Sequence, residues 1–273
     1  STNEFFSLPF QIYSTFVIEQ RYGFNRLTVS DFVQDKLKGL VVGAILGALL
    51  LSLVLSLMAH GGTYWWLYAF LGVSVFQLFA AWLYPSVIMP MFNKFTPVDD
   101  NLQTDAAALA ASVKFPLNRV FLMDGSRRST HANAFIVGLI GTKKIVLFDT
   151  LLDKVTRPQL LAVLAHELGH FMLKHVMKRT AIMLVITGII FFLIAVSKDV
   201  SALYHGFGFS KSSDFAAIII FSLIISEIAA PFAWAARLGS RRDEYAADKF
   251  AVKATGNSTD LSEALIALSK QNL

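Results

Sequence analysis

The chain has 273 residues, of which 55% are hydrophobic and only 16% are charged. Soluble domains carry about 25% charged residues, so this composition excludes an ordinary soluble or disordered protein and indicates a membrane protein with a substantial polar part. The absence of cysteine excludes disulfides, thiolate metal sites and a cysteine nucleophile, and the net charge of +5 without basic–aromatic runs indicates basic loops rather than a nucleic-acid groove.

The N-terminal part is predicted to approach the bilayer and then to cross it. Residues 1–39 are predicted as a juxtamembrane segment. Their apolar stretch, Phe5 to Ile18, is too short to span a membrane alone, so it is either the tail of a spanning helix or an interfacial segment. Two transmembrane hairpins are predicted, within 40–91 and 180–236. Their four spans carry few or no charges and are long enough, or nearly so, to cross the hydrocarbon core: 40–59, 64–84, 181–197 and 215–236.

The basic residues predict how these hairpins are oriented. Among the 24 Lys and Arg residues, only Lys198 and Lys211 fall on the side of the hairpin tips. Cytoplasmic loops carry the excess of Lys and Arg in membrane proteins. The polar bulk of the chain is therefore predicted to be cytoplasmic, at the inner membrane if the protein is bacterial or at the endoplasmic reticulum if it is eukaryotic.

The polar segment 92–179 is predicted to form one domain with helices and a small sheet. Gly141 and Thr142 suit a hairpin turn between its last two strands. The expected elements are a helix over 99–113 and strands over 119–124, 133–139 and 144–148.

Two further helical segments are predicted from their boundary residues. Thr156 and Gln159 suit a capping box at the start of the next helix, with Pro158 in its first turn. The segment 237–273 is polar and helical in pattern, with a break near Gly256.

The helix that begins at this capping box carries the sharpest chemical signal in the chain. His166 and His170 are four residues apart, so they share one helical face and can bind one Zn²⁺. Glu167 between them can act as general base on the attacking water. His175 is about 140° off this face and is predicted to be a surface or core residue rather than a ligand.

A catalytic zinc ion of this kind needs a third protein ligand and one open position. Glu244 is the candidate, because the second hairpin returns it to the membrane side of the two histidines. Asp248, one turn later, is predicted to accept a hydrogen bond from a ligand imidazole and to fix its tautomer. Arg241 or Arg242 is expected to form an orienting ion pair with Asp248 or Asp243; contacts with substrate or with lipid phosphates are the alternatives.

The substrate is expected to bind along the edge of the sheet. An extended peptide can add to an exposed strand through main-chain hydrogen bonds. The best candidate for that edge is Ala132-Asn133-Ala134-Phe135. The amide of Asn133 has both donor and acceptor groups for this contact, and an asparagine in a turn is the alternative interpretation.

Nearly the whole chain resembles one family, the type I CAAX prenyl proteases, which are integral-membrane zinc metalloendopeptidases, and six stretches spread along the sequence carry this resemblance. The resemblance, to a bacterial-like member, implies that His166, His170 and Glu244 are zinc ligands and Glu167 is the catalytic base. It also implies that Asn133 contacts the substrate backbone. The stretches are LPFQIYSTFVIEQRYGFNR from Leu8, PMFNKFTPV from Pro90, SRRSTHANAF from Ser126, KKIVLFDTLL from Lys143, AVLAHELGH from Ala162 and SRRDEYAADKFA from Ser240.

The fold class expected is mainly α: a multi-span membrane protein with four transmembrane helices plus a cytosolic zincin-like α+β metalloprotease domain with a small β-sheet. The expected cofactor is one Zn²⁺ per chain. The expected partners are the lipid bilayer and a peptide or protein substrate. The resemblance implies a substrate with a prenylated C-terminus, and no nucleic-acid partner is expected. The family has further spanning helices before Ser1 and a cytosolic segment after Leu273, so we expect both native ends to be missing.

Two other functions share part of this pattern. A quality-control protease of the HtpX heat-shock type has the same zinc motifs, although the FNKFTP and YSTFVIEQRYGFN stretches favour the CAAX family. An inactive membrane scaffold or chaperone could keep the fold, but it has no need of an intact HELGH motif together with Glu244.

Overall fold

Two units make up the chain, and each is built from segments that lie far apart in the sequence. The computed structural model describes residues 2–138 and 143–269. The first unit contains 1–38, 84–173 and 246–273, and the second contains 39–83 and 174–245. Two of the boundaries fall inside unbroken helices, so the backbone passes from one unit to the other without a linker.

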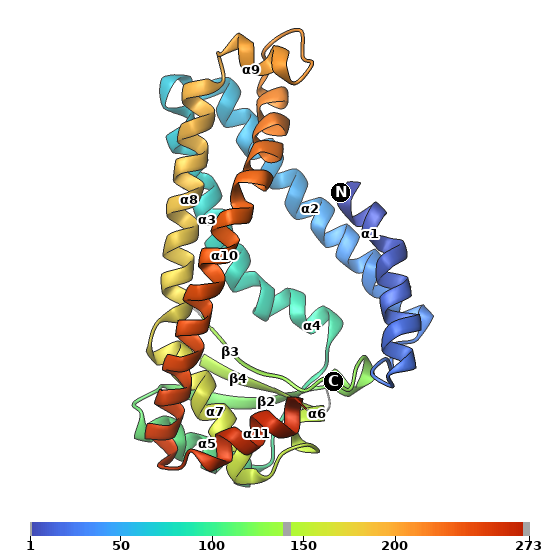
Figure 1. Ribbon diagram of the computed structural model, residues 1–273, viewed down its shortest axis with the longest axis vertical. Coiled ribbons are helices and arrows are strands. Elements are labelled where there is room, and N and C mark those ends of the chain that lie inside the picture. Colours follow the sequence, from blue (N-terminus) through green and yellow to red (C-terminus); the bar gives the residue numbers. More distant parts are fainter. Residues whose placement is uncertain (1, 139–142, 270–273) are drawn as a thin grey trace. The chain divides into compact units, whose positions relative to one another are not determined.

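A four-stranded mixed sheet forms the centre of the first unit (Figure 1). Its strands are β1 (Phe95–Pro97), β2 (Leu117–Met123), β3 (Ala134–Val137) and β4 (Lys143–Phe148), in the order β1-β2-β4-β3. β2 and β4 are parallel, and the other two pairs are antiparallel. The three predicted strands are confirmed, and β3 lies at an edge of the sheet. The predicted turn at Gly141 and Thr142 lies outside the described residues.

Helices α5 (Asp100–Ser112) and α7 (Arg157–Met172) pack on this sheet, and α11 (Thr259–Ser269) packs on α7. The Asp99 carboxylate caps α5 by accepting a 2.8 Å hydrogen bond from the Leu102 amide. The shared core is aliphatic and is contributed by helices and strands alike: Leu102, Ala106, Val120, Ala134, Ile145, Leu147, Leu160, Leu164 and Leu168. The site-bearing helix α7 is therefore fixed on one side by the sheet.

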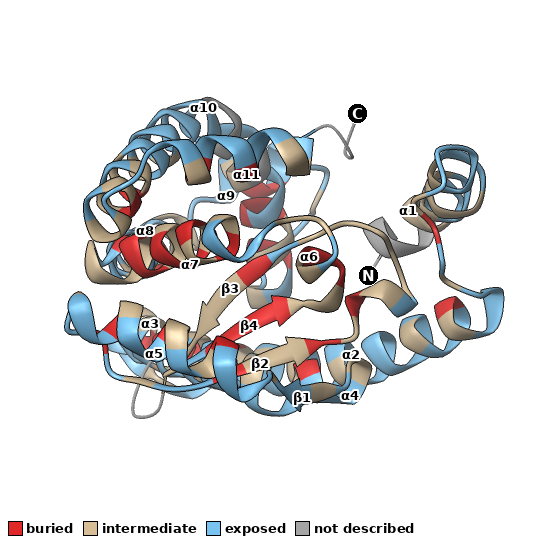
Figure 2. Cartoon of the chain, turned by 90° about the horizontal axis from the view of Figure 1, so that it is seen from below, coloured by how far each residue is buried: buried red, intermediate tan, exposed pale blue. Residues whose placement is uncertain are grey.

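The central strand β4 is buried on both faces, as Figure 2 shows. Ile145 and Leu147 face the helices, whereas Val146 packs with Met89 and Met123 on the other face. This alternation follows from the two-residue period of a strand. Short helical turns complete the unit: η3 (Tyr84–Ile88), α4 (Met89–Phe92), η4 (Gly125–Arg127) and α6 (Asp149–Leu152).

The N-terminal part of the first unit is also helical. It contains α1 (Thr2–Tyr13), a π-helical turn η1 (Ser14–Glu19) and the first turns of α2 (Val29–His60). Large apolar side chains such as Phe6 and Phe10 are exposed on α1. Because the following turn is broken at Gly23, which has a positive φ of 74°, α1 and α2 are separate helices.

The second unit is a bundle of long helices. It comprises most of α2, the turn η2 (Gly62–Tyr64), α3 (Trp65–Leu83), α8 (His175–Ser197), α9 (Ser201–Gly206) and the first part of α10 (Asp214–Thr255). α3 packs on α8, where Gln77 donates a 3.2 Å hydrogen bond to the Thr187 hydroxyl. The core is aromatic and aliphatic, with Trp65, Ala69, Phe191, Ile194, Tyr204 and Ile220.

Three segments of the described chain are long and apolar enough to cross a membrane: 29–60, 62–92 and 157–197. Only 6% to 11% of the residues in their most apolar windows are buried within the chain. Exposed apolar helices of this length are suited to contact lipid, so the chain is an integral membrane protein. The fourth expected span falls in α10, whose described apolar start, Asp214–Ile225, is shorter than a crossing.

α10 differs from the sequence expectation in one respect. We expected a span over 215–236 and a separate polar helical segment from 237, but α10 continues without a break to Thr255. The predicted break is confirmed at Gly256, which adopts a positive φ of 70° between α10 and α11. The apolar and ligand-bearing parts of this segment are therefore one helix.

Candidate metal centre

The start of α7 sets the direction of the helix that carries the two histidines. The Gln159 side chain accepts a 2.9 Å hydrogen bond from the Thr156 amide, as the predicted capping box requires. Leu160, Leu164 and Leu168 occupy one face and are buried against the sheet. His166 and His170 lie off that buried face and are only half-buried, so their rings are accessible.

The two imidazoles converge on one point. His166 Nε2 lies 3.1 Å from His170 Nε2, and the ring centroids are 4.8 Å apart. Two nitrogens bound to one tetrahedral zinc ion at about 2.0–2.1 Å are roughly 3.3 Å from each other. The spacing of these nitrogens therefore matches a pair of metal ligands.

Asp248 holds one of these rings from α10. Its Oδ1 atom lies 2.8 Å from His166 Nδ1, as the sequence spacing predicted. A carboxylate in this position keeps the proton on Nδ1 and leaves the Nε2 lone pair for a metal. Gly169 permits this contact, because a Cβ atom there would lie 3.1 Å from the Ala247 Cα atom.

Glu244 completes a set of three candidate ligands. It lies one turn before Asp248 in the same unbroken helix, and its ligand atom and those of His166 and His170 all lie within 4.8 Å of one another. Two imidazole nitrogens and a carboxylate oxygen are a donor set typical of catalytic zinc sites that keep one position open. The residues present therefore fit a zinc ion.

Arg179, rather than Arg241 or Arg242, forms the ion pair with Asp243. Arg179 on α8 contacts Asp243, with its Nη2 atom 3.0 Å from Oδ2, and the Nε2 atom of His175 lies 3.5 Å from Oδ1 of the same carboxylate. Within the part of the chain that the structure describes, Arg241 and Arg242 are exposed and form no such pair. His175 is 3% exposed, consistent with a core residue.

Sequence reasoning missed Arg179, although a signal was present. His175 and Arg179 are four residues apart and therefore share a face of α8. Asp243 lies 64 residues beyond Arg179 in the chain, so only the folded hairpin brings this face against it. Arg241 and Arg242 are closer to Asp243 in the sequence, but their helical positions point elsewhere.

The edge strand is preceded by an exposed polar side chain. Asn133 is exposed, its carbonyl accepts a 2.9 Å hydrogen bond from the Phe148 amide, and its Oδ1 atom accepts one from the Ala134 amide. Ala134 is buried in the core and Ala132 packs against it. Ala132 and Ala134 can therefore meet a substrate only through their main chains. β3 packs beside α7, so this edge lies in the same unit as the two histidines.

Comparison with known proteins agrees with this arrangement. Residues 1–94 match the model of the CAAX prenyl protease N-terminal region with five membrane helices, and residues 98–272 match peptidase family M48. The chain is 39% identical to "Probable CAAX prenyl protease 1" of Schizosaccharomyces pombe and 36% identical to "CAAX prenyl protease 1 homolog" of Arabidopsis thaliana. Each match covers 97% of this chain, but only 56% and 63% of the respective relative.

A solved structure shares the fold as well. The crystal structure of S. mikatae Ste24p superposes with a TM-score of 0.92 at 35% identity, over 99% of this chain and 67% of that one. The family match over residues 98–272 includes both candidate histidines, Glu244 and the edge strand. The chain therefore belongs to peptidase family M48, the CAAX prenyl protease type of membrane metalloprotease.

Proposed function

We propose that this chain carries the active centre of a membrane-embedded zinc metalloendopeptidase that removes the C-terminal tripeptide from prenylated CaaX proteins. The observation that supports this most strongly is the meeting of His166, His170 and Glu244, with Asp248 bonded to one imidazole. The names of the relatives support the substrate class.

His166, His170 and Glu244 would hold one zinc ion through two Nε2 atoms and a carboxylate oxygen. When bound, zinc polarises the scissile carbonyl and lowers the pKa of a coordinated water. Asp248 keeps the His166 ring in the tautomer that presents Nε2.

Glu167 is the general base in this proposal. It lies between the two histidines in the sequence of α7 and is half-buried. Its carboxylate takes a proton from the attacking water and later delivers that proton to the leaving amine. The peptide bond is thereby hydrolysed with no net proton change on the enzyme.

The edge of β3 is the proposed binding strand for the peptide. An extended substrate pairs with the main chain there, and the exposed Asn133 amide offers further donor and acceptor groups. A prenyl chain on the substrate partitions into lipid, which suits an enzyme whose helices face the bilayer. The distribution of Lys and Arg supports an active centre on the cytoplasmic side.

Paired glutamate variants test the mechanism. Glu167→Gln should leave zinc content nearly unchanged and lower peptide hydrolysis by at least about 10²–10⁴-fold, because a proton-transfer group is lost but no ligand. Glu244→Gln should lower zinc content and activity together, because an anionic ligand is lost. Zinc stoichiometry and cleavage are measured for both variants of the full-length protein. A Glu167→Gln enzyme that cleaves at the wild-type rate would show that Glu167 is not the base.

The choice of substrate separates the proposed function from its alternatives. The wild-type protein should cleave a farnesylated CaaX peptide faster than an unfolded membrane protein. The reverse preference would favour a quality-control protease, and zinc binding with no hydrolysis of either substrate would favour a scaffold.

A further inference from the structure

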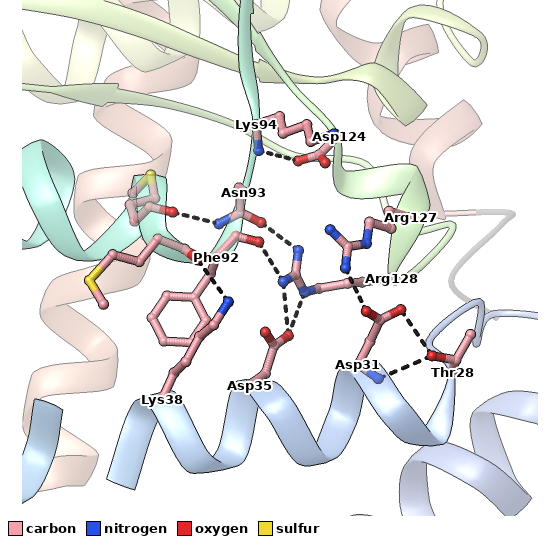
Figure 3. Close-up of polar contacts among 12 residues, drawn as sticks. Thr28, Asp31, Asp35, Lys38, Phe92, Asn93, Lys94, Asp124, Arg127 and Arg128 are labelled. Atoms are coloured by element: carbon pink, nitrogen blue, oxygen red, sulfur yellow. Dashed lines mark hydrogen bonds and ion pairs between the residues drawn. The ribbon is translucent and has the colours of Figure 1, made fainter. Parts of the chain in front are cut away.

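Arg128 is the centre of a polar cluster that joins three segments of the first unit (Figure 3). Its Nε and Nη2 atoms lie 2.9 Å and 2.8 Å from Asp35 Oδ2 on α2. Its Nη1 atom donates a 2.9 Å hydrogen bond to Asn93 Oδ1, and Nη2 also donates to the Phe92 carbonyl. One guanidinium, 22% exposed, therefore holds α2, the end of α4 and the loop after η4 together.

Asp35 lies in a part of α2 that extends beyond the hydrocarbon core. The helix has 32 residues, which is about 48 Å at 1.5 Å per residue, against about 30 Å for the core of a bilayer. All Asp, Glu, Lys and Arg residues of α2 precede Gly39. The cluster is therefore anchored on the extramembrane turns of this helix.

The main chain around Arg128 is paired as well as its side chain. The Arg128 carbonyl accepts a 3.0 Å hydrogen bond from the Arg26 amide, and the Thr130 amide donates a 3.1 Å bond to the Phe24 carbonyl. Between these bonds the two segments form an isolated antiparallel bridge. The loop is thus fixed from two directions, by the segment before α2 and by α2 itself.

The same loop leads directly into the edge strand β3. The Thr150 hydroxyl donates a 2.8 Å hydrogen bond to the His131 carbonyl, and the Phe148 amide donates a 2.9 Å bond to the Asn133 carbonyl. These two bonds attach the residues before β3 to the end of β4 and the start of α6, and the loop that Arg128 holds enters the strand from the other direction. A peptide that pairs with this edge needs its main-chain groups aligned with the strand within a fraction of an ångström.

We propose that Arg128 is a positioning residue for the substrate: it fixes the loop before β3 so that Asn133 and the strand edge bind an extended peptide in register with the metal centre. This inference rests on the proposed function, since it assumes that β3 is the binding strand. Arg128 itself contacts neither the metal ligands nor the peptide.

The chain contains a matched control for this residue. Arg127 is the adjacent arginine and also pairs with an aspartate of α2, with its Nη2 atom 2.5 Å from Asp31 Oδ1. Its side chain is 45% exposed and, among the described residues, bonds to that aspartate alone. Exposed pairs of this kind contribute little, so Arg127→Ala should leave the strand in place.

The test compares Arg128→Ala, Arg128→Lys and Arg127→Ala in the full-length zinc enzyme reconstituted in lipid vesicles. With an extended CaaX peptide as substrate, Arg128→Ala should raise KM about tenfold, the effect of losing one or two main-chain hydrogen bonds, with zinc content unchanged. Arg128→Lys should give a smaller rise, because it keeps the charge but not the planar fork. Arg127→Ala should stay within about twofold of wild type.

Equal KM values for folded, zinc-loaded Arg128→Ala and Arg127→Ala would overturn the inference. If Arg128→Ala does not fold, the KM values of Arg128→Lys and Asp35→Asn are measured instead. A wild-type KM in both variants would refute the positioning role of Arg128. If the wild-type enzyme cleaves no peptide, the proposed function fails rather than the positioning role. Hydrogen exchange of the backbone amides then tests the positioning role. The amides of residues 134–137 should exchange faster in Arg128→Lys than in Arg127→Ala, and equal exchange rates would refute that role.

Discussion

Gly169 shows how the candidate metal centre depends on the absence of a side chain. Its position on α7 faces α10 so closely that a Cβ atom would meet the Ala247 Cα atom at 3.1 Å, the Ala247 carbonyl oxygen at 3.2 Å and the Phe250 Cβ atom at 3.2 Å. Backbone atoms cannot rotate away as a flexible side chain can. Glycine at this position therefore lets the two helices approach at the distance at which Asp248 reaches His166.

We therefore expect Gly169→Ala to weaken zinc binding. Separation of α7 from α10 by a few tenths of an ångström lengthens the Asp248–His166 hydrogen bond, and loss of such a partner typically costs about 10–100-fold in metal affinity. Gly239→Ala is the control, because Gly239 also lies on α10 and, apart from its chain neighbours and the adjacent backbone of its own helix, no described atom lies within 4 Å of the position that a methyl group would take there. Competition with a chelator measures the affinities, and equal values for the two variants would contradict this account.

Single residues were predictable from the sequence where helical spacing alone decides their position. His166 and His170 share a face because they are four apart, and the same spacing relates Glu244 to Asp248. The orienting arginine was not predictable in this way, because the choice between Arg179 and Arg241 depends on how two distant helices meet. Arg128 gave no signal either, since its acceptors lie on separate segments.

Pairs of helices explain how the third candidate ligand is held. His175 and Arg179 on α8 both reach Asp243, the residue before Glu244, and Arg179 also donates a 3.3 Å hydrogen bond to the Ser240 hydroxyl. These residues of α8 and α10 belong to the second unit. α8 therefore fixes the rotation of α10 at the position from which Glu244 projects.

Arg179→Gln should consequently speed zinc release, but only modestly. The Arg179 side chain is 53% exposed, and exposed ion pairs are worth about 0.2–1 kcal/mol, which corresponds to a rate increase of up to about fivefold. Arg242→Gln should leave the rate unchanged, because that side chain forms no ion pair in the described chain. Stopped-flow transfer of zinc to a chromogenic chelator gives both rates. A larger effect of the Arg242 change would reverse the assignment.

Elements with a clear period or cap were predicted well, and those that depend on tertiary context were not. α7 was predicted from its capping-box residues, α5 from its helical pattern and β4 from its apolar run. β1 was missed because it has three residues and ends at Pro97, which gives almost no periodic signal. The continuity of α10 was missed because its composition changes from apolar to polar near residue 237. The helical backbone nevertheless continues through this point.

At the scale of the whole molecule, the distribution of charge makes a prediction about sidedness. The hairpin tip at His60 lacks Lys and Arg, whereas the polar part of α10 is rich in them. Because basic segments remain cytoplasmic, the two regions should lie on opposite sides of the membrane. Since this chain has no cysteine, His60→Cys and Arg241→Cys each introduce its only thiol. An impermeant maleimide should label one but not the other in sealed vesicles, and labelling of both would contradict the topology.

The unbroken course of α10 places a restriction on how this chain can change in evolution. The apolar start of α10 and Glu244 belong to one continuous helix, so they share a single helical phase. Insertion of one residue between them would turn the carboxylate by about 100° and move it about 1.5 Å along the axis. A substitution in this stretch leaves the direction of Glu244 unchanged as long as the helix continues, whereas a change of length does not. The apolar part and the ligand-bearing part of α10 must therefore keep a fixed number of residues between them.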